Sequence, residues 1–265
     1  MAELDQILAR YTHPNTSSLH GASFVAVDRD GPRPVPRRFW PHQIRASSQS
    51  KLTTSVAVMQ AVEQGLIGLD DDVRKDVPAL RGMQVLMGFD DQGQPTLEEV
   101  AELLTLCHLV SHTSGFAYDA RHLLLVKYAQ WAGRTANMFG HHGRADASPH
   151  LPAGHPWRDQ HDILSGETRP DSRNGTATRK SASALCGLVN RDDVVGRESV
   201  RRRSKGTISR DGLPNLLWFV DRTSSMAATF FTQNMPMDDA EARKLCTKPE
   251  EALYRLVTAK AKETK

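Results

Sequence analysis

The sequence predicts an α+β fold in which helices cover an antiparallel sheet. Residues 21–31 alternate between apolar and polar side chains and end in a turn dipeptide, as a strand entering a hairpin does. Residues 216–220 and 226–232 are two β-rich runs joined by a polar turn, which indicates an antiparallel pair. Asp238 and Asp239 are expected early in one helix, and a last helix with one apolar face is expected from about residue 247. Strands followed by a terminal helix are typical of an α+β sheet whose face is protected.

The chain before residue 70 is predicted to contain two helices and one strand. Residues 1–12 fit a short amphipathic helix, whereas residues 32–38 are basic and broken by prolines, so no partner strand is expected there. Residues 48–65 are predicted to form a helix, because apolar side chains recur at spacings of three and four and Gly65 provides a stop signal.

The next seventy residues are predicted to be mostly helical. Residues 82–93 are expected to form a loop, and the pattern from Thr96 to Glu99 matches a capping box that opens a helix. That helix ends at His112, which is either a catalytic base or part of a structural loop. Another helix is expected through residues 123–128.

Residues 141–204 have a different character. They are rich in Gly, Pro, Arg and Asp and show no helical or strand period, so we expect an irregular, disordered segment inside one domain spanning residues 1–265. Five histidines suggest a metal site, but their irregular spacing without nearby cysteines argues against one. The basic run 201–205 suggests nucleic acid, but without interleaved aromatics a solvated linker is expected. The histidines are His141, His142, His150, His155 and His161.

The composition favours an ordinary soluble domain. The 265 residues are 39% hydrophobic and 25% charged, and a net charge of +3 is too small to indicate a nucleic-acid partner. The three cysteines (Cys107, Cys186 and Cys246) are odd in number and far apart, as in an intracellular protein with reduced thiols. The acidic start and the lack of a long apolar run favour a cytoplasmic protein without membrane contact. No metal and no cofactor are expected.

A candidate nucleophile lies at the start of the helix over residues 48–65. Ser48 and Lys51 form a Ser-x-x-Lys motif, with the lysine one turn later on the same face. At a helix N-terminus, free N–H groups and the dipole favour negative charge. Lys51 can take the hydroxyl proton where burial favours the uncharged amine, so the pair is the minimum for acyl-serine chemistry. The alternative is a serine cap followed by a solvated lysine.

The surroundings of the motif favour the catalytic interpretation. Four further segments follow it in order: residues 63–73, 109–116, 206–209 and 212–222. Together they resemble the serine β-lactamase superfamily, and within it the β-lactamase-like esterases and the fungal polyketide-pathway transesterases, or lovastatin-type acyltransferases. The resemblance covers about residues 44–140 and 205–260.

This resemblance implies a β-lactamase/transpeptidase-like fold, an antiparallel sheet with a helical subdomain, here incomplete. It implies an acyltransferase of secondary metabolism, or a hydrolase, with Ser48 as nucleophile and Lys51 as base. Arg45 and Gly212 match substrate-binding positions. The implied partners are a small-molecule acyl donor, an alcohol acceptor and an acyl-carrier domain of a polyketide synthase, without a cofactor.

The sequence departs from this family in two motifs. The chain has four tyrosines, and none lies in residues 129–253, where the catalytic tyrosine is expected. A Trp-Gly-Gly-like triplet on the edge strand is replaced by Arg210-Asp211-Gly212. We expect the Asp211 carboxylate to lie near the developing oxyanion and to repel it. The tyrosines are Tyr11, Tyr118, Tyr128 and Tyr254.

The chain is also shorter than its relatives, with the loss in residues 31–43 and 141–204. Both stretches lack apolar period, as expected from a shifted reading frame or misplaced exon joins. A non-catalytic remnant, unstable or acting only by binding, is therefore the alternative to an enzyme.

Overall fold

The computed structural model describes residues 2–13, 15, 19, 21–33, 46–136, 153–154, 181–184, 187–196, 202–236 and 238–263. The chain forms two compact units: residues 1–57 with 166–265 make the first, and residues 58–165 make the second. The single domain expected over residues 1–265 stays a prediction. No helix within the described residues is both long and apolar enough to span a bilayer.

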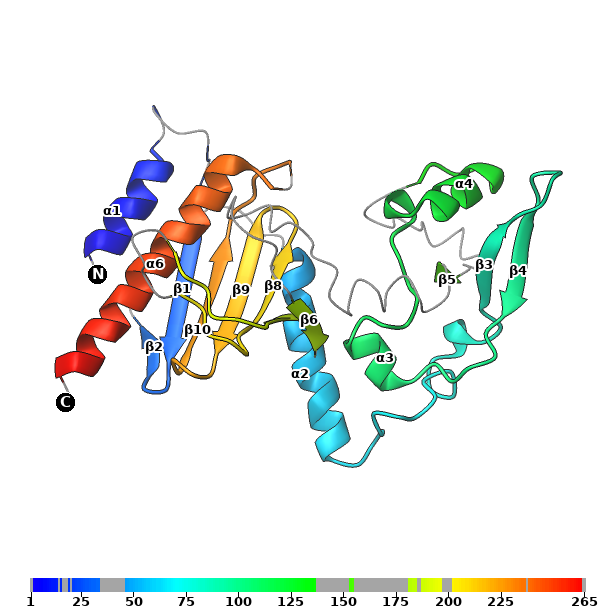
Figure 1. Ribbon diagram of the computed structural model, residues 1–265, viewed down its shortest axis with the longest axis horizontal. Helices are drawn as coiled ribbons and strands as arrows, with labels where there is room; N and C mark the ends of the chain where they lie inside the picture. Colours follow the sequence, from blue (N-terminus) through cyan, green and yellow to red (C-terminus); the bar gives the residue numbers. More distant parts are fainter. Residues whose placement is uncertain are drawn as a thin grey trace. The chain divides into compact units, whose positions relative to one another are not determined.

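The first unit is built on a seven-stranded sheet in which every neighbouring pair is antiparallel (Figure 1). The predicted hairpin is confirmed, since Leu217 of β9 pairs with Phe230 of β10. In spatial order the strands are β2 (Gly31–Arg33), β1 (Ser23–Asp28), β10 (Met226–Phe231), β9 (Leu216–Asp221), β8 (Ile208–Gly212), β7 (Gly187–Asn190) and β6 (Ser181–Ala184).

Two helices pack side by side on one face of this sheet, α1 (Ala2–Tyr11) and α6 (Ala240–Glu263) (Figure 1). Their buried core contains Leu4, Leu8, Phe24, Phe219, Phe230, Leu245 and Leu253. The two helices predicted from about residues 238 and 247 are a single helix, which begins at Ala240 and runs on through Pro249. An interior proline costs about 3 kcal/mol, and burying one large apolar side chain contributes about 1.5–3 kcal/mol, so packing on the sheet offsets it.

The proline-rich stretch after β1 was predicted to form no strand, and this is wrong for its first residues. Gly31–Arg33 form β2, which pairs with β1 at the edge of the sheet. Edge strands tolerate proline because one side of the ladder needs no donor. The short pairing beside Pro32 is therefore compatible with its missing N–H.

The prediction that residues 141–204 are irregular is also wrong for those of them that the structure describes. Strands β6 and β7 extend the sheet, and the side chains of Arg202, Arg203 and Ser204 are buried. The strands escaped prediction because each has only four residues, too few to show a period. The prediction of a solvated linker at residues 201–205 is wrong, because Arg202 and Arg203 form ion pairs with a carboxylate that is far away in the sequence.

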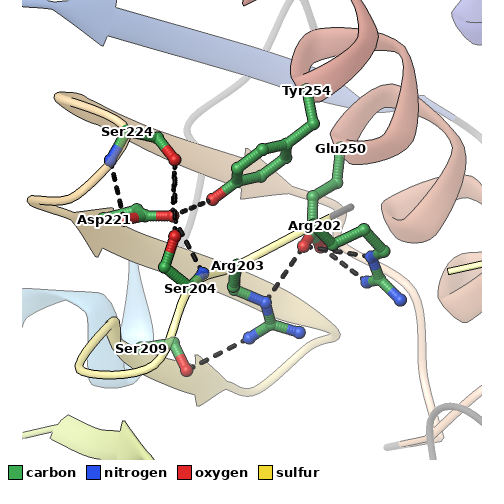
Figure 2. A network of polar contacts seen from close by, with 8 residues as sticks. All are labelled: Arg202, Arg203, Ser204, Ser209, Asp221, Ser224, Glu250 and Tyr254. Carbon is green, nitrogen blue, oxygen red and sulfur yellow. Dashed lines mark hydrogen bonds and ion pairs between the residues drawn. The ribbon is translucent and has the colours of Figure 1, made fainter. Parts of the chain in front are cut away.

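That carboxylate belongs to Glu250 of α6 (Figure 2). Arg202 donates from Nη2 to Glu250 Oε2 at 2.7 Å, and Arg203 donates from Nε to Oε1 at 3.0 Å. The side chains are 4%, 6% and 1% exposed for Arg202, Arg203 and Glu250. Burial alone would lower the pKa of Arg202, but the adjacent Glu250 carboxylate raises it above the ordinary value. Arg202 thus stays charged and paired with Glu250.

A second buried carboxylate, Asp221 at the end of β9, accepts four hydrogen bonds (Figure 2). Ser204 and Ser224 donate from their backbone N–H groups, Ser224 also from its hydroxyl, and Tyr254 donates its hydroxyl at 2.7 Å. Burial raises the pKa of Asp221, but these donors outweigh it and the pKa is lowered. We call Arg202, Arg203, Ser204, Ser209, Asp221, Ser224, Glu250 and Tyr254 the polar network; it ties the segment before β8 to β9 and α6.

The second unit corrects two further predictions. The expected loop at residues 82–93 contains a strand, and the helix expected from Thr96 is a strand that pairs with it. Asp90 holds the turn between them, because its carboxylate accepts from the backbone N–H groups of Gln92 and Gln94. The elements are η2 (Pro78–Leu80), β3 (Gln84–Phe89), β4 (Pro95–Glu99), α3 (Leu106–Val110), η3 (Asp119–Arg121), α4 (Leu123–Trp131) and β5 (Ala153–Gly154).

Candidate active site

Ser48 lies in a tight turn that leads directly into a helix. The turn is η1 (Ser47–Gln49), and α2 (Ser50–Glu63) follows without a break. Ser47 has a φ of 43°, in the left-handed region that L-residues with side chains avoid. Such a conformation costs about 1–3 kcal/mol and persists only where the surroundings hold it.

The structure brings Ser48 and Lys51 together. Lys51 Nζ donates to Ser48 Oγ at 2.9 Å, and the pair is partly buried. This contact is the geometry expected of two residues one helical turn apart. The predicted roles of nucleophile and base stay predictions.

Gly212 lies against the same turn. It is the last residue of β8, and a Cβ atom added there would lie 3.2 Å from the Ser48 nitrogen and 3.4 Å from the Ser48 Cβ. These separations are tighter than most side-chain contacts, so only glycine leaves the space beside Ser48 unobstructed. The sequence-predicted residue Gly212 is therefore brought to the candidate nucleophile.

The expectation for Asp211 is wrong. Side chains alternate along a strand, so the residue next to Gly212 points to the opposite face of the sheet from Ser48. Asp211 accordingly lines a cavity of about 50 Å³ beside α6, together with Arg202, Arg203 and Glu250. Its carboxylate does not repel charge at Ser48. Arg210, two residues before Gly212, is the other member of the triplet on the Ser48 face.

The expectation that Gly212 lies on an edge strand needs correction too. Strand β8 has β9 on one side and β7 on the other. Strand β7, however, pairs only with Ile208 and Ser209. Within the described residues, the stretch from Arg210 to Gly212 therefore extends beyond its outer neighbour and resembles an edge locally.

The first unit offers no tyrosine suited to acid–base chemistry at Ser48. Its two tyrosines, Tyr11 and Tyr254, belong to α1 and α6 on the far face of the sheet. Burial and the hydrogen bond to Asp221 raise the pKa of Tyr254 far above its ordinary value, so this hydroxyl keeps its proton. Tyr118, half-exposed, and Tyr128, buried, belong to the second unit.

Three sets of predicted residues do not enter this geometry. Arg45 and the histidines of residues 141–161 lie outside the described residues. His112 belongs to the second unit, where it follows α3 with a φ of 58° and donates its backbone N–H to Leu109. That placement is a turn, in keeping with the structural alternative.

Sequence reasoning missed Gln49, the residue after Ser48. Its side chain is only 9% exposed, and its amide bonds to the backbone of β9 and β10. The one signal in the sequence is that Gln49 lies between Ser48 and Lys51, on a turn that has to pack against the sheet. A polar side chain is ordinarily expected to face solvent, so this signal did not indicate burial.

The fold is that of a β-lactamase-like protein, and the Ser48–Lys51 contact lies within it. The chain belongs to the Beta-lactamase family, whose sequence profile matches residues 19–158. The expected resemblance to fungal polyketide-pathway acyltransferases is confirmed. Over 115 residues the chain is 38% identical to ML-236A carboxylate methylbutanoyltransferase of Penicillium citrinum, covering 43% of this chain and 28% of that protein.

Two further relatives differ in their named activity. Monacolin J acid methylbutanoyltransferase of Aspergillus terreus is 43% identical over 97 residues, covering 36% of this chain and 24% of that protein. A lovastatin esterase of Penicillium rubens is 38% identical over 91 residues, covering 34% and 22%. The matches thus span only about a quarter of the length of these relatives.

Solved structures confirm the predicted fold class. The unliganded simvastatin synthase of Aspergillus terreus matches with a TM-score of 0.70 at 20% identity, covering 95% of this chain and 97% of that one. EstCE1, a hydrolase with promiscuous acyltransferase activity, matches with a TM-score of 0.55 at 14% identity, covering 96% and 98%. At these identities the likeness concerns the fold alone.

Proposed function

We propose that this protein is an acyl-serine acyltransferase that moves an acyl group from an ester or thioester to an alcohol. The observation that carries the proposal is the 2.9 Å contact between Lys51 Nζ and Ser48 Oγ. A serine hydroxyl is a weak nucleophile, and a basic group within hydrogen-bond reach is what activates it. Membership of the Beta-lactamase family and relatives named as acyltransferases support the same chemistry.

In the first half-reaction, Ser48 Oγ attacks the acyl carbonyl carbon while its proton passes to the uncharged Lys51 amine. The tetrahedral adduct collapses, the bond to the leaving oxygen or sulfur breaks, and Lys51 returns the proton to that atom. In the second half-reaction, the acceptor alcohol attacks the acyl-serine and gives its proton to Lys51. Ser48 then leaves with that proton, so the enzyme is regenerated.

The developing oxyanion needs a hydrogen-bond donor close to Ser48. The Ser48 backbone N–H is the donor proposed here, and Gly212 keeps a side chain from crowding the same space. Donors fixed in place before the reaction stabilise the transition state without reorganising. Arg45, three residues before Ser48, is proposed to contact the acceptor.

The relatives suggest the class of substrate. Their names describe transfer of a methylbutanoyl group to ML-236A carboxylate or monacolin J acid. We propose a small acyl donor and a hydroxylated small-molecule acceptor for this chain. An acyl-carrier domain of a polyketide synthase is the proposed natural source of the acyl group.

Hydrolysis is the second candidate, favoured by the relative named as a lovastatin esterase. Water replaces the acceptor alcohol in that case, with Ser48 and Lys51 in unchanged roles. A remnant that has lost catalysis is the third candidate, favoured by the absence of a suitable tyrosine in the first unit.

The test is covalent labelling with a fluorophosphonate probe. We expect one labelled serine, Ser48, and no label in Ser48→Ala, whereas Thr54→Ala, an exposed change on the same helix, labels normally. Label that persists in Ser48→Ala removes the nucleophile assignment. Supplying a short acyl thioester with and without an alcohol, and weighing the products, then separates transfer from hydrolysis.

A further inference from the structure

The side chain of Gln49 links the turn that carries Ser48 to the middle of the sheet. Its Nε2 donates to the backbone oxygens of Leu217 at 3.3 Å and Phe230 at 3.0 Å. Its Oε1 accepts from the hydroxyl of Thr229 at 3.1 Å. The amide therefore uses both ends, and the two carbonyl partners fix which end is the nitrogen.

These partners belong to one rigid part of the fold. Leu217 and Phe230 are cross-strand partners of β9 and β10, and Thr229 points to the same face as Ser48 because it precedes Phe230, a residue of the opposite core. Gln49 thus attaches η1 to two strands at once. A buried amide with all these bonds made holds its neighbours more rigidly than an apolar contact does.

The turn needs such an attachment because its own backbone is strained. Ser47 has a φ of 43°, and the local hydrogen bonds run only within the turn, from Gln49 N–H to Ala46 and from Ser50 Oγ to the Ser47 oxygen. Such bonds close the turn but do not fix its place on the sheet. Among the hydrogen bonds described above, those of the Gln49 side chain are the ones that join the turn to the sheet.

We propose that Gln49 is a positioning residue that holds Ser48 at its place against Gly212 and Lys51. The inference rests on the proposed function and names a residue for it that touches neither substrate nor the reacting atoms. Gln49 acts through the backbone, because moving η1 by about 1 Å is enough to cost roughly a hundredfold in rate. Sequence comparison of the Ser-x-x-Lys motif does not identify it.

The experiment replaces Gln49 by leucine, an apolar side chain that is one atom shorter but of similar volume, and so removes the amide. We expect the maximal labelling rate of Ser48 by the fluorophosphonate to fall about 10- to 100-fold, while the probe concentration at half-maximal rate stays unchanged. Amide hydrogen exchange at Gln49 and Ser50 should accelerate at least tenfold, with exchange in α1 unaltered. Thr229→Val, which removes the hydroxyl that donates to Gln49 Oε1 and lies 3.5 Å from the Leu217 oxygen but leaves the Gln49 amide in place, should show a smaller effect of the same kind.

Tyr254→Phe is the matched control, since it also removes one buried hydrogen bond of the first unit but on the opposite face. It should lower the melting temperature and leave the labelling rate within twofold. Equal loss of labelling in Tyr254→Phe and Gln49→Leu, or wild-type labelling in Gln49→Leu, overturns the inference.

The exchange measurement separates this inference from the proposed function. If the wild-type protein takes no label, the acyl-serine function fails, and the role of Gln49 is decided by exchange alone. Unchanged exchange at Gln49 and Ser50 in Gln49→Leu then overturns it. If Gln49→Leu does not fold, Thr229→Val supplies both readouts.

Discussion

The two faces of the sheet at β8 and β9 are built for different purposes. On the α6 face, the polar network holds buried carboxylates that accept several hydrogen bonds each, as Asp221 and Glu250 do. On the other face, Ser48 has Lys51 as its hydrogen-bond partner and Gly212 as an open neighbour. Strands β8 and β9 thus support the polar network on one face and the candidate active site on the other. A substitution on one face is therefore expected to change either stability or reactivity, not both.

The largest expected effect concerns turnover on the Ser48 face. Loss of one positioned acid–base group typically lowers a rate about 10²- to 10⁴-fold, and the first unit has no tyrosine to fill that place. We therefore expect slow or undetectable hydrolysis of a p-nitrophenyl ester and of a short acyl thioester. Arg210→Trp with Asp211→Gly should not restore it, since Asp211 faces α6.

The contrary result is clear. Turnover of several per second that disappears in Ser48→Ala would show that a group other than a tyrosine of the first unit supplies the missing function.

The next effect is on stability from the α6 face. Glu250→Ala leaves Arg202 and Arg203 buried without their carboxylate, which should cost about 3–5 kcal/mol of unfolding free energy. Glu241→Ala is the control, because its exposed pair with Lys244 contributes about 0.3–0.5 kcal/mol. Urea unfolding measures both. A loss below about 1 kcal/mol for Glu250→Ala would mean that the ion pairs do not support the fold.

Two neighbouring residues sharpen the comparison of the faces. Gly212→Ala places a Cβ against Ser48, so the labelling rate should fall about tenfold with little change in stability. Asp211→Ala should leave labelling within twofold, since this side chain lies on the α6 face. The labelling rate of Ser48 and the melting temperature are measured for both variants. Equal effects on labelling would contradict the assignment of faces.

The smallest effect is a pH dependence at Asp221. Its pKa in the folded protein lies below the ordinary value of 3.8, so its contribution to stability is complete above about pH 5 and is lost as the pH falls through the folded pKa. Asp221→Asn lacks this titration. The difference in unfolding free energy between the two proteins should therefore narrow from about pH 5 to pH 2.5. A constant difference would show that the carboxylate is not stabilised in its charged form.

Local patterns predicted the elements that depend on adjacent residues. The β9–β10 hairpin follows from two apolar runs and a polar turn, and the Ser48–Lys51 contact follows from one helical turn. The face on which Asp211 lies could not be predicted in this way. It depends on which side chains of β8 face α6. The sequence Ile208-Ser209-Arg210-Asp211-Gly212 has no clear alternation of apolar and polar residues from which this could be predicted.

The buried charges failed prediction for a different physical reason. A run of arginines normally indicates solvent, and Arg202 and Arg203 become buried only because Glu250 lies opposite them, 47 residues or more along the chain. Gln49 was missed similarly, since its partners Leu217 and Phe230 are backbone groups of distant strands. A polar side chain is therefore expected to be exposed only if no distant part of the chain supplies a buried hydrogen-bonding or charged partner for it.

The pairing of β1 with β10 has a consequence for the order of events during synthesis. Ser23 pairs with Phe231, about 200 residues later, which at about 5–20 residues per second is a delay of roughly 10–40 s on the ribosome. The second unit is continuous in sequence and can close its own contacts during that interval. The nascent β1 meanwhile exposes the edge that later pairs with β10, so chaperone binding to this segment should matter most before β10 emerges.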